Sequence, residues 1–319
     1  MSSTRTTHLT RHVTARPAVA VLAALSLTAL AGCGSSSGSS TVAAPHSSTA
    51  THAMPMPSDT AMAGHDTGSS MGGMGGGGHL ADPGKGLLVT ENGFTLKPST
   101  TTLTVGPQKL VFQIVDSSGK PVTQYTPDQT KLLHFYLARQ DLTGYQHLHP
   151  TLSNGTWSIA VSSLTPGPYR MYTDFVAKDA MGSDKPTVLS TILTVPGSYT
   201  PAAVPAAASS TTADGLTATM AGSITAGTAS TVSFQITENG KPVTDLEQYL
   251  DSFAHMTALH TGDLAYQHVH PGLTAKAGQK GGPALPFEVE LPEKGTWRLF
   301  LQVQRAGALH LLPLTVTVR

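Results

Sequence analysis

The chain is 319 residues long, and its 19 basic and 19 acidic residues give a formal net charge of zero. Charged residues make up 12% of the sequence and form no basic cluster, which excludes the electrostatic surface of a nucleic-acid-binding protein. The single cysteine excludes a disulfide framework. The folded part must therefore be stabilised by packed cores or by bound metal.

Residues 1–32 are predicted to be an export signal, because a basic start is followed by an apolar run at 18–30 that is too short for an ordinary membrane span. The run closes on Leu-Ala-Gly-Cys, which resembles the lipobox of bacterial lipoproteins. This resemblance implies that Cys33 is lipidated and anchors the chain to the extracytoplasmic face of the cell membrane. The alternative is a plain secretory signal with a chance cysteine.

Residues 33–86 are rich in Ser, Gly, Ala, Thr and Pro, a composition that predicts a disordered tether. Thioether and imidazole groups are ligands for copper and zinc, so the tether is a candidate auxiliary metal-binding segment. Low-complexity drift is the alternative, because no regular spacing relates these residues. The tether ligands are His46, His52, Met54, Met56, Met62, His65, Met71, Met74 and His79.

The remainder of the chain is a duplication. Residues 93–115 align with 215–237 without a gap, and both segments run on into the sequence GKPVT. A Pro/Ala-rich stretch between the two copies is typical of a linker between domains. The sequence therefore predicts a first domain at 87–196, a linker at 197–212 and a second domain at 213–319.

Each copy contains short β-rich runs that are separated by Gly, Pro, Asn and Asp turns. The predicted fold class is all-β, with two tandem immunoglobulin-like or cupredoxin-like β-sandwich domains after the tether. The only cysteine lies in the signal, which excludes the His₂Cys copper site of cupredoxins. Residues 127–133 and 245–253 are expected to be short helices or loops.

A histidine pattern recurs in both copies. The sequence YQHLHP at 145–150 returns as YQHVHP at 266–271, and a further histidine, His134 or His255, precedes the first histidine of each motif by 13 residues. Alternate residues of a strand share one face, so each HxH pair is expected to point to one side. The apolar residue between the two histidines is expected to enter the core.

Neighbouring strands lie about 4.8 Å apart, so an HxH strand beside a strand with one more histidine can bring three imidazoles together. Three neutral imidazoles suit zinc or copper and leave one coordination position open. We therefore expect one metal site in each domain. The predicted ligands are His134, His147 and His149 in the first domain, and His255, His268 and His270 in the second.

Asp174 is a candidate fourth ligand of the first site, or an acceptor that fixes an imidazole tautomer. The alignment places Gln302 at the equivalent position of the second copy, where it would be a weak ligand. The sequence thus predicts two unequal sites, with the tighter one at His147 and His149. The alternative is that Asp174 lies in a turn and that the imidazoles only bond nearby carbonyls, because duplication preserves packing as well as ligands.

These residues resemble a group of bacterial, often actinobacterial, cell-envelope proteins that carry a QHLHP-type motif and a later Asp-Phe pair. Such proteins are described as secreted or heavy-metal-binding, with an immunoglobulin-like or YtkA-like β-sandwich. The match covers His134, residues 146–150 and residues 174–175 in the first copy, and His255 with residues 267–271 in the second. The second copy departs from the pattern, since it has Gln-Val in place of Asp-Phe.

The expected function is extracytoplasmic copper or zinc sequestration, buffering or transfer, with the membrane and a metal donor or acceptor protein as partners. A non-enzymatic interaction or spacer module with structural histidines is the alternative. No enzyme is expected, because no Glu accompanies either HxH and no Ser/His/Asp order or phosphate loop is present.

Overall fold

The computed structural model describes residues 85–319. The predicted signal peptide, the lipidation site Cys33 and the histidines and methionines of the tether lie outside these residues.

The first domain contains β1 (Thr90–Glu91), β2 (Phe94–Pro98), β3 (Gly106–Val115), β4 (Tyr125–Thr126), β5 (His134–Arg139), β6 (Gln146–Leu148), β7 (Thr151–Ser153), β8 (Thr156–Leu164), β9 (Gly167–Lys178) and β10 (Asp184–Val195). The second contains β11 (Ser210–Ala213), β12 (Leu216–Ala221), β13 (Ser230–Glu238), β14 (Lys241–Pro242), β15 (Ala254–His260), β16 (Tyr266–Pro271), β17 (Ala284–Val289), β18 (Gly295–Arg305) and β19 (Ala308–Val318).

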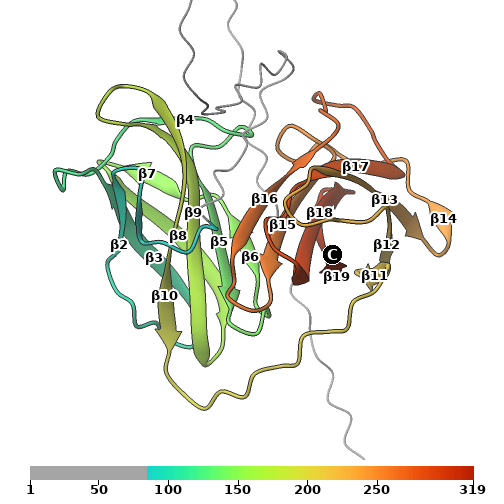
Figure 1. The fold of residues 1–319 in the computed structure, drawn as a ribbon, viewed down its shortest axis with the longest axis horizontal. Coiled ribbons are helices and arrows are strands. Elements are labelled where there is room, and N and C mark those ends of the chain that lie inside the picture. The colour runs from blue at the N-terminus through green and yellow to red at the C-terminus, as the bar shows by residue number, and fades with distance from the viewer. Residues whose placement is uncertain (1–84) are drawn as a thin grey trace, which may run out of the picture. The chain divides into compact units, whose positions relative to one another are not determined.

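The first domain is a sandwich of two antiparallel sheets, which Figure 1 shows in blue to yellow-green. One sheet has the order β1-β2-β3-β8-β7, and the other has the order β10-β9-β5-β6 with β4 beside β9. Their inner faces share one apolar core, in which Phe112 of β3 stacks on Phe135 of β5 with ring centroids 5.9 Å apart. Trp157 of β8 also stacks on Phe112, with ring centroids 6.4 Å apart.

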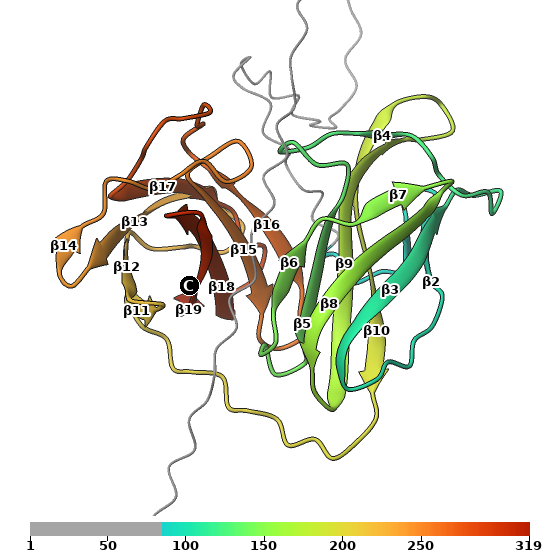
Figure 2. The same cartoon turned by 180° about the vertical axis from the view of Figure 1, so that it is seen from behind.

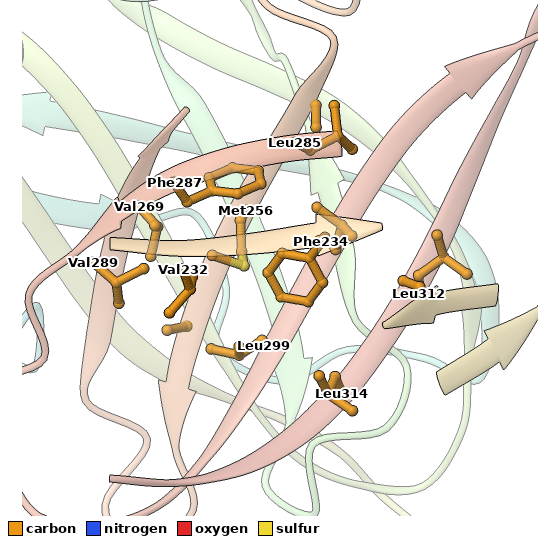
Figure 3. Close-up of a cluster of buried hydrophobic side chains, with 14 of the residues drawn as sticks. Val232, Phe234, Met256, Val269, Leu285, Phe287, Val289, Leu299, Leu312 and Leu314 are labelled. Carbon is orange, nitrogen blue, oxygen red and sulfur yellow. The ribbon is translucent and has the colours of Figure 1, made fainter. Parts of the chain in front are cut away.

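The second domain repeats this arrangement with one difference. Its strands form a continuous path β11-β12-β13-β17-β16-β15-β18-β19, because β16 pairs with both β15 and β17 and so joins the two layers. In the first domain the same segment is divided into β6 and β7. The core contains Phe234, Met256, Phe287 and Leu299, which come from four different strands (Figure 3).

A third apolar cluster lies between the two domains, where both views show β6 beside β16 (Figures 1 and 2). Its residues come from the outer faces of β5, β9, β15, β16 and β18 and from the adjoining loops. Tyr145 stacks on Phe300 of the second domain with centroids 3.9 Å apart, and the Tyr172 hydroxyl donates to the Leu264 carbonyl at 2.6 Å. The outer faces of these sheets are therefore buried.

Both faces of the histidine strands follow the predicted alternation. Phe135 and Leu137 enter the core of the first domain, whereas Tyr136 and Ala138 enter the interdomain cluster. The strand is buried on both sides, because each domain covers the other.

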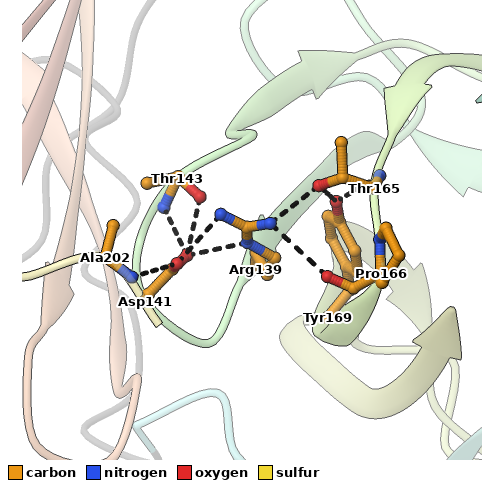
Figure 4. Close-up of polar contacts among 7 residues, drawn as sticks. All are labelled: Arg139, Asp141, Thr143, Thr165, Pro166, Tyr169 and Ala202. Atoms are coloured by element: carbon orange, nitrogen blue, oxygen red, sulfur yellow. Dashed lines mark hydrogen bonds and ion pairs between the residues drawn. The ribbon is translucent and has the colours of Figure 1, made fainter. Parts of the chain in front are cut away.

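A polar network holds the connection between the domains to the first domain (Figure 4). The Asp141 carboxylate accepts bonds from Arg139 at 2.9 and 3.0 Å and from the backbone N–H of Ala202 at 2.9 Å. Burial opposes ionisation of Asp141, but these bonds outweigh it and lower its pKa to about 2. The connecting segment is thus anchored at Ala202.

The fold is all-β, with two tandem immunoglobulin-like sandwich domains, as the sequence predicted. Residues 127–133 and 245–253 are loops with tight turns rather than helices. Within residues 85–319, no helix is long and apolar enough to span a membrane.

Candidate metal centre between the two domains

Five of the six predicted histidines lie on strands that face the interdomain interface, and His149 directly follows β6. On β6, His147 pairs with Tyr136 of β5, and on β16, His268 pairs with Thr257 of β15. These equivalent positions all belong to the outer sheet faces. Because the two outer faces pack together, the imidazoles of one domain meet those of the other.

Three of these side chains form a group able to hold a metal ion. One nitrogen of each of His134, His147 and His255 lies within 4.8 Å of the others, and all three residues are buried. The rings of His147 and His255 are stacked with centroids 4.4 Å apart, across the domain boundary. The candidate ligand set therefore combines two histidines of the first domain with one of the second.

This arrangement differs from the predicted one of a separate site in each domain. The ring of His149 lies beside the group, with its centroid 5.0 Å from that of His134 and 4.8 Å from that of His147. His149 is nevertheless not part of the three-nitrogen set. In the second domain, the ring of His270 stacks on that of His268, with ring centroids 5.2 Å apart. The difference arises because the predicted ligand faces are also the docking faces.

One ring nitrogen of each of the candidate ligands His147 and His134 is hydrogen-bonded to an oxygen acceptor. Nδ1 of His147 lies 2.7 Å from Oε1 of Gln302, and Nε2 of His134 lies 3.2 Å from the Asp128 carbonyl. The other ring nitrogens, Nδ1 of His134 and Nε2 of His147, face each other at 3.1 Å. Two nitrogens bound to one tetrahedral ion at about 2.0–2.1 Å would be about 3.4 Å apart, so this spacing fits a shared ion.

His255 provides the third nitrogen. Its Nε2 lies 3.4 Å from the Tyr136 hydroxyl, whereas its Nδ1 is buried without a hydrogen-bond partner. The Tyr136 ring stacks on His147 at 4.4 Å and so closes one side of the group. An unpaired nitrogen in a buried site is energetically costly, and a bound ligand at Nδ1 of His255 would remove this cost.

Asp174 does not bond to the histidines of its own domain. Its Oδ2 accepts from Nδ1 of His268 at 3.1 Å and from the Tyr266 hydroxyl at 2.9 Å, both in the second domain. The Gln129 amide nitrogen lies 2.7 Å from Nε2 of His268, so both ring nitrogens of His268 are engaged. Of the two predicted roles for Asp174, the geometry matches the acceptor that orients an imidazole, with its target in the other domain.

The electrostatic surroundings divide the histidines into two kinds. Burial, together with neighbouring imidazoles, lowers the pKa of His134, and it lowers the pKa values of His147 and His255 further. Burial would also lower the pKa of His268, but the hydrogen bond and charge of Asp174 outweigh it and raise the pKa. The three clustered imidazoles are therefore held in the neutral form that coordinates metal.

The pKa values of the neighbouring residues His149 and Asp174 are also lowered, each for a different reason. Burial and the charges of His134 and Lys131 lower the pKa of His149 to about 3. The pKa of Asp174 is lowered by His268 although burial opposes this.

Sequence reasoning identified all six histidines but missed the groups that orient them. Gln302 was interpreted only as a weak ligand of its own domain, and Tyr136, Gln129 and the Asp128 carbonyl were not recognised. A signal was present for Gln302, because it stands opposite His255 in the strand register, as Asp174 stands opposite His134. No sequence pattern shows that both side chains reach across to the other domain.

A second group of possible ligands lies at the end of β15, in the turn that follows it and in the loop before β18. One atom each of His260, Asp263 and Glu293 lies within 4.8 Å of the others. Asp263 accepts from Nδ1 of His260 at 2.8 Å, and Glu293 is paired with Lys85. The ammonium group of Lys85 already balances Glu293, which makes this group a poorer cation site than the interdomain histidines.

A family model described as a domain of unknown function (DUF8832) matches residues 89–189 and again residues 211–319. The chain belongs to this family. The repeated match coincides with the internal duplication and with the two sandwich domains. No curated protein matches the chain.

Three solved structures are similar to this chain. InvD of Yersinia pseudotuberculosis is 14% identical with a TM-score of 0.23 and covers 72% of this chain, which spans 58% of that structure. A putative membrane-anchored protein from Corynebacterium diphtheriae is 12% identical with a TM-score of 0.19, and the match covers 71% of this chain and 58% of that protein's chain. The D0–D1 domain of intimin is 11% identical with a TM-score of 0.19, and the match covers 70% of this chain and 96% of the intimin chain.

Proposed function

We propose that this chain binds one copper or zinc ion between its two domains, with His134, His147 and His255 as ligands. The observation that carries the proposal is the convergence of three buried imidazole nitrogens from both domains within 4.8 Å of one another. Nδ1 of His255, buried without a partner, supports it further.

Burying three imidazoles side by side is unfavourable for a protein that makes no use of them. Each ring loses its hydration, and protonation is suppressed by burial and by the neighbouring rings. A divalent ion with nitrogen ligands would satisfy all three lone pairs at once. Imidazole suits zinc and copper, and three protein ligands leave a fourth position for water or for His149, whose buried Nε2 has no partner.

The cellular role proposed with this site is sequestration, buffering or transfer of the ion by a binding protein rather than an enzyme. Anchoring to the extracytoplasmic face of the membrane through Cys33 is part of the proposal and is supported by the N-terminal sequence pattern. The metal donor or acceptor would then be another protein of the cell envelope.

Metal content measured on the full chain tests the site. After stripping with a chelator and reloading with Cu(II) or Zn(II), elemental analysis of the wild type and of His147→Ala should differ by one ion per chain. His310→Ala is the matched control, because His310 lies on β19 with Asp214 3.6 Å away and outside the cluster. Any ion held by the tether is common to all three proteins. Equal metal content in wild type and His147→Ala would refute the proposal.

A further inference from the structure

Gln302 lies at the centre of the interface and is almost fully buried, with 4% of its surface exposed. It belongs to β18 of the second domain, but its Oε1 lies 2.7 Å from Nδ1 of His147 in the first domain. An amide oxygen only accepts hydrogen bonds, so Nδ1 of His147 must carry the hydrogen. A neutral His147 then has its lone pair on Nε2.

His134 is held in the opposite tautomer. Its Nε2 lies 3.2 Å from the carbonyl oxygen of Asp128, which also only accepts, so the hydrogen is on Nε2 and the lone pair is on Nδ1. The carbonyl is fixed by a tight turn in which Asp128 and Lys131 exchange two backbone bonds of 2.8 Å. The acceptor is therefore set by the backbone and not by a mobile side chain.

The two lone pairs consequently face each other. Nδ1 of His134 and Nε2 of His147 are 3.1 Å apart, and neither carries a hydrogen in these tautomers. Such a contact is repulsive without a cation between or beside the nitrogens. A metal ion bound by both nitrogens would accept the two lone pairs and remove this repulsion.

We propose that Gln302 is a positioning residue which, with the Asp128 carbonyl, fixes His147 and His134 in opposite tautomers, so that one ion is bound by Nε2 of His147 and Nδ1 of His134. This inference rests on the proposed function and adds to it which nitrogens coordinate and which residue of the second domain directs a ligand of the first. A hydrogen-bonded second partner of this kind orients the imidazole and raises its basicity.

The first domain contains the counterpart of Gln302. Asp174 occupies the equivalent register position and bonds Nδ1 of His268 across the interface, as Gln302 bonds Nδ1 of His147. A carboxylate is the stronger acceptor of the two. Gln302→Glu would therefore place on His147 the kind of acceptor that His268 already has.

Nitrogen NMR of the full chain tests the tautomers without any metal. Histidine ¹⁵N shifts of the metal-free protein should show the hydrogen of His147 on Nδ1 and that of His134 on Nε2. The hydrogen of His147 on Nε2 would overturn the inference, because the 3.1 Å contact would then be an ordinary hydrogen bond. This readout is independent of whether the protein binds metal, so it separates failure of the inference from failure of the proposed function.

Affinity measurements on three variants complete the test. Gln302→Leu should weaken Cu(II) or Zn(II) binding by about 10–100-fold and release the His147 tautomer. Gln302→Glu should retain the Nδ1–H tautomer and bind at least as tightly as the wild type. Gln304→Leu, on the same strand and the same side two residues further on, is the control and should change neither. Wild-type affinity and tautomer in Gln302→Leu would contradict the positioning role.

Discussion

The two domains have the same core architecture but differ where they meet. Asp174 of the first domain reaches His268 of the second at 3.1 Å, and Gln302 of the second reaches His147 of the first at 2.7 Å. Such reciprocal contacts are those of an approximate two-fold interface between copies of one surface. The acceptor is a carboxylate on one side and an amide on the other.

The difference extends to the groups around the histidines. The first domain has Gln129, whose amide covers Nε2 of His268, whereas the equivalent position of the second domain is Leu250. Both nitrogens of His268 are thus engaged, while Nε2 of His147 faces only another imidazole. The equivalent histidines His147 and His268 therefore differ in their surroundings, because the residues around them diverged.

The largest expected effect comes from removing the ligand of the second domain. We expect His255→Ala, like His147→Ala, to abolish binding of the interdomain ion, because the proposed site uses ligands of both domains. Isothermal titration of each variant with Zn(II) or Cu(II) measures this. Two independent sites would instead lose one ion of two in each variant, and that result would show that the domains bind separately.

A second comparison sets Asp174→Leu against Gln302→Leu. We expect Asp174→Leu to lower the free energy of unfolding by about 3–5 kcal/mol, because it removes a buried charge that Tyr266 and His268 both bond. Gln302→Leu should cost about 1–3 kcal/mol, since it leaves one buried N–H unpaired. Urea denaturation of the metal-free proteins measures both losses. Equal losses would show that the acceptors are energetically equivalent.

The stability of the metal-free protein should depend on pH through the lowered pKa values of the clustered histidines. Above about pH 6.5 these rings are neutral in both states, and below it only the unfolded chain takes up protons, so stability falls by about 1.4 kcal/mol per pH unit for each such histidine. The raised pKa of His268 acts in the opposite direction, since its contribution is complete below pH 6.5 and is lost as the pH rises.

Denaturation midpoints between pH 7 and pH 5 measure this slope. His149→Gln should reduce it by about one histidine, because the pKa of His149 is lowered to about 3. A stability that is unchanged between pH 7 and pH 5 would contradict the expectation.

The smallest effect is expected at the Tyr136 hydroxyl, and the Tyr266 hydroxyl is the comparison. Tyr266→Phe removes a 2.9 Å hydrogen bond to the Asp174 carboxylate and should cost about 1.5–3 kcal/mol. Tyr136→Phe removes a 3.4 Å contact with His255 and should cost about 1 kcal/mol or less. Thermal unfolding of the two variants compares them. A greater loss in Tyr136→Phe would indicate that this hydroxyl, and not the carboxylate pair, holds the interface.

Strand alternation predicted much of the local structure. The alternation predicted that the apolar residue between the histidines of each motif enters the core. Leu148 packs against the core of the first domain, and Val269 is buried in that of the second. The repeat predicted two similar sandwiches, and the second match to the family model agrees with it. Alternation could not show what covers the outer face, because that depends on partner residues 92 to 155 positions away in the chain.

The orienting groups were harder to predict for the same reason. Asp174 and Gln302 could be aligned from the sequence, but each was assigned to the histidines of its own domain. A side chain on an outer sheet face points away from its own core, so its partners are decided by whatever packs against that face. The turn at Asp128 was expected only as part of a short helix or loop, and its carbonyl carries no sequence signal.

The sequence by itself determined that the chain is duplicated, that its domains are β-rich, and that each copy carries three histidines at the same spacing. Those properties follow from periodicity and residue type, which are local. Only the tertiary structure decided that the two histidine faces meet, and that His134, His147 and His255 form one group while Asp174 and Gln129 engage His268. The reason is physical: docking two apolar sheet faces fixes which side chains become neighbours, and that choice is made by packing across the interface.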